Sequence, residues 1–167
     1  IDAARVGTGE FHDALADEMI VDQRVGATDQ AGCLDCQQIR VARPGDEADI
    51  VSMIHELAAF ERAPEQCTVT ESQIGTALFG DDAVASCFLV EVDGHTAAMA
   101  LWFRTFSTWD GVAGIHLEDL YVRDRFRRRG IARALLAALA TECLEKDYSR
   151  LGWSVLDWNT DAIALYD

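Results

Sequence analysis

The chain has 167 residues, of which 50% are apolar and 26% are charged, a size and composition typical of one folded domain and not of a disordered chain. Its 29 acidic and 14 basic residues give a formal net charge of −15, so most of the surface repels nucleic acid and anionic lipid. No stretch approaches the roughly 18 consecutive apolar residues that span a membrane. We therefore expect a protein without nucleic-acid or membrane partners.

The five cysteines are an odd number, at positions 33, 36, 67, 87 and 143, and we expect them to be reduced thiols in a cytoplasmic protein. Cys33 and Cys36 have the spacing of a zinc or redox pair, but no second pair or neighbouring histidine completes a ligand set. A structural zinc, a redox pair and an incidental pair are the alternatives. We expect an incidental pair and no metal.

Residues 1–37 form an acidic extension that differs from the rest of the sequence. Within it, Phe11, Leu15 and Met19 recur at a four-residue spacing that predicts a short amphipathic helix. From Gln38 onward the pattern becomes regular, so we place the main domain at residues 38–167.

The first half of this domain alternates between strand and helix signals. Residues 39–42 alternate as a strand, and Asp46 is placed to cap a helix that has Ile50, Ile54 and Leu57 on one face. Next, Thr70 and Gln73 form a capping box that predicts the start of a second helix, which ends at Gly80. An Asp-Gly pair, typical of a type I′ turn, then separates two strands at 86–92 and 96–103.

The second half predicts two strand–helix units. The first is a strand at 115–122 followed by a helix at 130–146, whose buried side we assign to Ile131, Leu135, Leu139 and Leu144. The second is a strand at 151–156 followed by a helix capped by Asn159 or Thr160. This order of elements predicts an α/β fold around a mixed sheet.

A basic loop stands out against the acidic background. The segment from Arg123 to Arg133 contains six of the 14 basic residues and one acid, Asp124. It leads from a strand into the start of a long helix, where free N–H groups and the helix dipole favour a phosphate. The glycine patterns of a dinucleotide fold and of a P-loop are both absent. The sequence therefore predicts an anion site here, with a basic surface turn as the alternative.

This loop carries a resemblance to a known family. Arg127-x-x-Gly130-x-Ala132, after a strand ending in Leu-Glu-Asp-Leu-Tyr-Val, resembles the acetyl-CoA signature of the GNAT N-acetyltransferase superfamily. Further segments occur in the same order as in its diamine and thialysine N-acetyltransferases: 57–62, 106–111, 117–122 and 156–166. The resemblance implies a GNAT-like mixed, mostly antiparallel central sheet flanked by helices, in a homodimer. It also implies that the domain at 38–167 is truncated and lacks its C-terminal strands.

The resemblance implies acetyl-CoA as the cosubstrate. The pantetheine arm would pair with the backbone of one strand, and the pyrophosphate would lie on the N–H groups of the basic loop. The expected cofactor-binding residues are Leu120, Tyr121, Val122, Arg127, Arg128, Arg129, Gly130, Ile131, Ala132, Arg133, Asn159 and Ala162.

The resemblance also assigns the chemistry. Tyr166 matches the tyrosine that donates a proton to the leaving thiolate, and Glu118 matches the carboxylate that contacts and helps deprotonate the amine. Glu61 and Trp153 are the further expected acceptor-binding residues. The implied reaction is acetyl transfer to a small cationic amine that is polyamine- or lysine-like. An aminoglycoside or protein amine as acceptor, and a non-catalytic CoA-binding module, are the alternatives.

Three further positions bear on the expected acceptor site. By strand alternation, His116 shares the face of Glu118, whereas Asp119 is expected on the opposite face with a structural hydrogen-bonding role. Phe60 stands where the diamine enzymes tend to carry tyrosine, so one polar contact to the acceptor is missing.

Overall fold

The computed structural model describes the backbone of residues 17–22 and 37–166 and the side chains of residues 38–166. Six strands form one sheet in the order β1-β6-β5-β4-β3-β2. They are β1 (Asp17–Asp22), β2 (Gln37–Val41), β3 (Ser86–Val92), β4 (His95–Ser107), β5 (Val112–Val122) and β6 (Arg150–Val155). The β5–β6 pair is parallel and every other pair is antiparallel. The predicted mixed, mostly antiparallel sheet is therefore confirmed.

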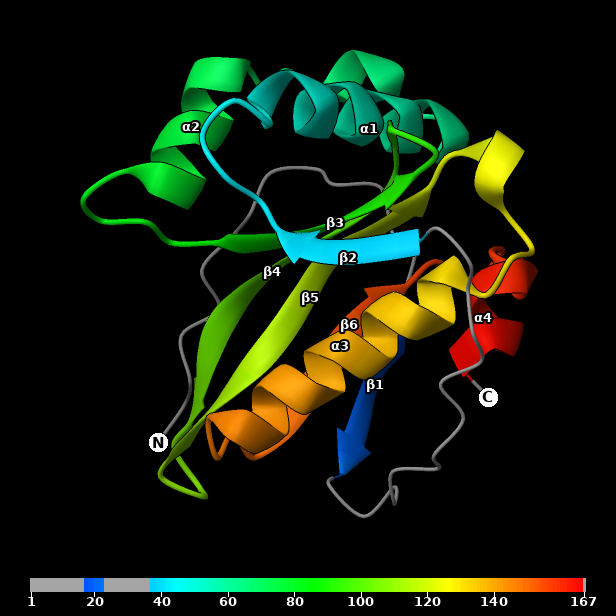
Figure 1. The fold of residues 1–167 in the computed structure, drawn as a ribbon. Coiled ribbons are helices and arrows are strands. Elements are labelled where there is room, and N and C mark those ends of the chain that lie inside the picture. Colours follow the sequence, from blue (N-terminus) through cyan, green and yellow to red (C-terminus); the bar gives the residue numbers. More distant parts are fainter. Residues whose placement is uncertain (1–16, 23–36, 167) are drawn as a thin grey trace.

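Helices cover both faces of the sheet. They are α1 (Glu47–Phe60), α2 (Glu71–Phe79), α3 (Ile131–Glu145) and α4 (Thr160–Tyr166), with short 3₁₀ turns η1 (Pro64–Gln66) and η2 (Asp124–Phe126). Figure 1 shows α1 and α2 on one face, α3 on the other, and α4 beside the end of β6. No helix within residues 17–22 and 37–166 is long and apolar enough to cross a membrane.

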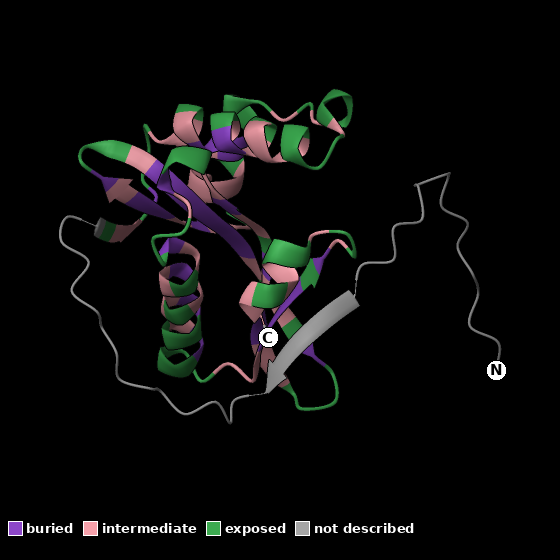
Figure 2. Ribbon diagram, turned by 90° about the vertical axis from the view of Figure 1, so that its right-hand side faces the viewer, coloured by how far each residue is buried: buried purple, intermediate pink, exposed green. Residues whose placement is uncertain are grey.

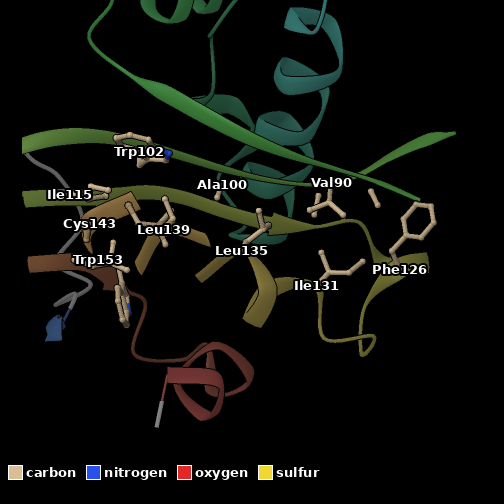
Figure 3. Packing of buried hydrophobic residues seen from close by; sticks show 14 of the residues in the cluster. Val90, Ala100, Trp102, Ile115, Phe126, Ile131, Leu135, Leu139, Cys143 and Trp153 are labelled. Atoms are coloured by element: carbon tan, nitrogen blue, oxygen red, sulfur yellow. The ribbon is translucent and has the colours of Figure 1, made fainter. Parts of the chain in front are cut away.

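Two apolar cores hold these layers together. Under α1 and α2, the fully buried side chains of Ile50 and Met53 pack against Leu89 and Met99. On the other face, α3 packs against the sheet, and Figure 3 shows its Leu135 and Leu139 beside the strands. Figure 2 shows the consequence, since the strands are mostly buried while the outer sides of the helices are exposed.

Most predicted elements are confirmed, with local corrections. The Thr70–Gln73 capping box opens α2 as predicted, and Asp93 and Gly94 both have positive φ at the predicted hairpin turn. The last buried residue of α3 is Cys143, because Leu144 is 58% exposed and lies one position off the buried row.

Two predictions nearer the N-terminus also change. The side chain of Asp46 does not cap α1; its carboxylate instead accepts hydrogen bonds from the Arg40 guanidinium and the Arg43 N–H. The helix expected from Phe11 to Met19 is wrong where it can be tested, since residues 17–22 form strand β1, paired with β6. Phe11, Leu15 and the pair Cys33 and Cys36 lie outside the described residues.

A bulge in β5 changes which side chains face which core. Leu101 of β4 pairs with Asp119 and Trp102 pairs with Leu117, so Glu118 has no residue opposite it. Because of this extra residue, Leu117 faces the α3 core while Tyr121, four positions later, faces the α1–α2 core. The bulge therefore reorients the side chains that follow Leu117.

The parallel pairing of β5 with β6 is short. It joins Ile115 to Leu151, His116 to Gly152 and Leu117 to Trp153, and ends there although β5 continues to Val122. Beyond this point the two strands separate, and the edge of β5 that faces β6 is left without a strand partner.

Gly114 is expected to hold the closed end of this strand pair together. A Cβ on Gly114 would lie 2.9 Å from the carbonyl oxygen of Arg150, so Gly114→Ala should destabilise the protein by about 1–3 kcal/mol in urea unfolding. The control is Gly75→Ala, inside α2, where the added Cβ would lie 3.6 Å from the flexible side chain of Glu47 in α1. This substitution should stabilise the protein by about 0.5–1 kcal/mol, because alanine favours a helix more than glycine does. If Gly114→Ala were as stable as the parent protein or more stable, the close approach of Gly114 to the Arg150 backbone would be contradicted.

Candidate functional site

A cleft of about 290 Å³ lies where β5 and β6 separate. Four elements contribute to it, since α1 and α4 supply side chains on either side of the separating strands. Its lining residues are Leu57 and Glu61 from α1, Leu117, Glu118, Asp119 and Leu120 from β5, Trp153, Ser154, Val155 and Leu156 at β6, and Asn159, Ala162 and Tyr166 at α4. The cleft thus brings together seven of the residues that the sequence singled out: Glu61, Glu118, Leu120, Trp153, Asn159, Ala162 and Tyr166.

The side chains of Tyr121 and Val122 point away from this cleft. Tyr121 is buried in the α1–α2 core, and Val122 packs against the α3 core. Their backbone nevertheless lies on β5 beyond its last pairing with β6. An extended ligand could therefore pair with this edge as an added strand would.

The basic loop presents a row of free backbone donors. Within the described residues, the N–H groups of residues 128–133 donate no hydrogen bond. Arg128 and Gly130 have φ of 63° and 78°, and Gly130 is the N-cap of α3. A Cβ on Gly130 would meet nothing within 4 Å, so the space above the loop is open. Consecutive free N–H groups at a helix start suit an anion such as pyrophosphate.

Arg127 has a different position from its arginine neighbours. Its Nε donates to the carbonyl oxygen of Val122 at 2.9 Å, and its guanidinium pairs with Asp124 at 3.0 Å. The same guanidinium lies 5.0 Å from the Phe60 ring and 5.6 Å from the Tyr121 ring. These contacts fix the end of β5 against α1, so Arg127 positions the loop, while Arg128, Arg129 and Arg133 are exposed around its free N–H groups.

Tyr166 is held in the cleft by an aromatic contact. Its ring lies 4.8 Å from the ring of Trp153, and both pack at the edge of the α3 core. Burial raises the pKa of Tyr166 above its ordinary value, so the phenol stays protonated at neutral pH. Asn159 fixes the start of α4, because its Oδ1 accepts a hydrogen bond from the N–H of Ala162 at 3.2 Å.

Three carboxylates approach the cleft. Glu118, at the bulge, is 55% exposed and has His116 Nε2 3.9 Å from its Oε2, so the two share one side of β5 as predicted. Glu61 lies at the end of α1, where burial raises the pKa of its carboxyl. Burial, with the nearby charges of Glu118 and Glu61, raises the pKa of Asp119 to about 6.

Asp119 corrects the sequence analysis. Its carboxyl lines the cleft and has no hydrogen bond or ion pair among the described residues, so the expected structural hydrogen-bonding role of this side chain is wrong. Alternation failed to place it because the bulge at Glu118 shifts the register. Since no Lys or Arg among the described side chains lines the cleft, these carboxylates make it attractive to a cation. The described residues contain no group of His, Cys, Asp and Glu side chains arranged to hold a metal ion.

Comparison with known proteins decides the family. The model of the acetyltransferase (GNAT) family matches residues 50–167. The chain belongs to the GNAT acetyltransferase family. It is therefore an acyl-CoA-dependent N-acetyltransferase, and acetyl-CoA is the family's cosubstrate.

Curated relatives of this GNAT chain act on amines, by their names. A thialysine N-epsilon-acetyltransferase of Caenorhabditis elegans is 38% identical over 78% of this chain and 79% of that protein. An L-ornithine N5-acetyltransferase of Arabidopsis thaliana is 25% identical over 78% of this chain and 77% of that protein.

A solved structure supports the GNAT fold alone. The ribosomal-protein-alanine N-acetyltransferase of Brucella melitensis superposes with a TM-score of 0.60 at 20% identity, and covers 78% of this chain and 88% of that one.

The burial of Asp119 in this GNAT domain predicts a pH-dependent stability. Its pKa rises from 3.8 to about 6 on folding, so the carboxyl favours the folded state at low pH and that contribution is lost as pH rises through 6. Asp119→Asn should therefore stabilise the protein at pH 8 by on the order of 1–3 kcal/mol, and by less at pH 5. Urea unfolding at both pH values measures this. Asp82→Asn, at an exposed aspartate outside the cleft, is the control, and an equal effect of Asp119→Asn at both pH values would contradict the shift.

Proposed function

We propose that this protein transfers the acetyl group of acetyl-CoA to a primary amine of a small, positively charged acceptor. The observation that carries the proposal is the cleft itself, which combines three carboxylates with a half-buried, protonated tyrosine beside an unpaired strand edge. The thialysine and ornithine acetyltransferases among its relatives support an amine of this size.

The residues present fit the cosubstrate. The free N–H groups at residues 128–133 would receive the pyrophosphate, with Arg128, Arg129 and Arg133 supplying positive charge around it. The edge of β5 at Leu120, Tyr121 and Val122, which has no strand partner, would hold the pantetheine arm. Asn159 and Ala162, at the start of α4, line the same cleft. Acetyl-CoA supplies an acetyl group that its thioester bond activates.

The carboxylates have the task of preparing the amine. An aliphatic ammonium has a pKa near 10 and must lose its proton before the nitrogen can attack. Glu118 is the exposed carboxylate that can accept this proton and pass it to solvent. Asp119 and Glu61 line the same cleft and hold the acceptor by charge.

Tyr166 has the complementary task. As the amine nitrogen bonds to the carbonyl carbon, it releases a second proton to solvent and becomes an amide nitrogen. The carbon–sulfur bond breaks and its electron pair stays on sulfur. The Tyr166 hydroxyl donates its proton to this sulfur and later regains one from solvent. The products are an acetylated amine and free CoA. The homodimer and the cytoplasmic location expected from the sequence stay predictions.

Acetyl transfer is tested with Tyr166→Phe. Removing the hydroxyl should lower kcat about 100-fold for acetylation of lysine-like amines, measured by release of the CoA thiol. The Phe ring keeps the contact with Trp153, so the unfolding free energy should stay within about 0.5 kcal/mol of the parent value. Full activity in this variant, or no thiol release by the parent protein with any amine, would contradict the proposal.

Cosubstrate binding is tested at the basic loop. The double variant Arg128→Gln/Arg129→Gln should weaken CoA binding about 10-fold in isothermal titration, because it removes two positive charges beside the phosphate donors. Arg43→Gln/Arg104→Gln removes the same charge at exposed positions outside the loop and cleft, and should leave CoA affinity unchanged. Equal weakening by both double variants would mean that overall charge, not the loop, binds CoA.

A further inference from the structure

An arginine stands at the edge of the cleft beside one of its carboxylates. Arg62 follows Glu61 at the end of α1 and has a φ of 63°, a left-handed conformation that is unfavourable for arginine. Its guanidinium carbon lies 5.2 Å from the centre of the Trp158 ring. Trp158 in turn lies 5.8 Å from Phe60 and immediately precedes the cleft residue Asn159. Arg62 is therefore held across the gap between α1 and the start of α4.

Arg62 has no acidic partner, although the chain carries a net charge of −15. Within the described residues, its side chain forms no salt bridge and no hydrogen bond. Among the described arginines, Arg40, Arg123 and Arg127 are paired with a carboxylate, whereas Arg62 is among those whose charge has no carboxylate partner. Stacking on an aromatic face leaves the N–H donors in the plane of a guanidinium available, and their fork matches a carboxylate.

The cleft thus has negative groups inside and a positive group at its edge. Glu61, Glu118 and Asp119 make the interior negative, and Arg62 adds a positive group at its edge. A diamine or polyamine would place a second positive charge at this edge, where Arg62 repels it. An amino acid that places its side-chain amine in the cleft would instead bring its carboxylate toward the guanidinium.

We propose that Arg62 binds the carboxylate of the acceptor, so that the preferred acceptors are amino acids with a side-chain amine. This inference rests on the proposed function and names the substrate class of the same cleft. Arg62 selects the acceptor and takes no part in proton transfer.

The experiment compares acceptors that differ only in the carboxylate. Lysine against 1,5-diaminopentane, and ornithine against 1,4-diaminobutane, are each tested for binding to the CoA-loaded protein by isothermal titration and for acetylation. The parent protein should favour the amino acid of each pair. Arg62→Gln should reduce this preference at least 10-fold, and Arg62→Glu should reverse it in favour of the diamine.

A matched control separates Arg62 from general charge. Arg125 also lies over an aromatic ring, 4.6 Å from the Phe126 centre, and lies outside the cleft. Arg125→Gln removes the same charge and should leave the preference unchanged. CoA affinity, measured separately, should be equal in the parent protein and in Arg62→Gln.

Each contrary outcome has a distinct meaning. A preference for the diamine in the parent protein, or an unchanged binding preference in Arg62→Gln, would overturn the role of Arg62 whether or not acetylation occurs. Weaker CoA binding by Arg62→Gln would overturn it by assigning Arg62 to a cosubstrate phosphate. Failure of the parent protein to acetylate any amine would instead contradict the proposed function.

Discussion

The separation of β5 from β6 is the constraint on which the site depends. A continuous parallel pair would use both strand edges and leave no room between them, whereas here the pairing ends at Leu117 and Trp153. The bulge at Glu118 falls at the same point. The side chains of β5 therefore change the face to which they point where the pairing with β6 ends. One local irregularity therefore opens the cleft, exposes the strand edge and places Glu118 and Asp119 in it.

The two cores make this irregularity sustainable. Leu117 is anchored in the α3 core just before the bulge, and Tyr121 in the α1–α2 core just after it. Arg127 then ties the end of β5 to α1 through Val122 and Phe60. Because β5 is fixed by burial on both sides of the bulge, the carboxylates between these anchors are positioned although they lack hydrogen-bonding partners of their own.

The sequence predicted the elements well because each carried a local signal. The Thr70–Gln73 capping box and the Asp93-Gly94 turn are short patterns whose geometry depends on neighbouring residues alone. The role of Asp119 could not be predicted this way, since alternation assumes an unbroken register and the bulge is visible only once β4 is paired. The intramolecular partners of Arg127 and the aromatic support of Arg62 likewise depend on tertiary contacts between distant segments.

Backbone strain supports the same location for the site. Four described residues other than glycine have positive φ: Arg62, Asp93, Arg128 and Asp147. The two aspartates occupy a hairpin turn and the end of α3, where short polar side chains tolerate this conformation. Arginine has no such local compensation, yet Arg62 directly follows α1 and Arg128 lies in the basic loop before α3. Strain of this kind persists where it places a functional group, and both residues direct positive charge to places where we propose that an anionic group of a substrate binds.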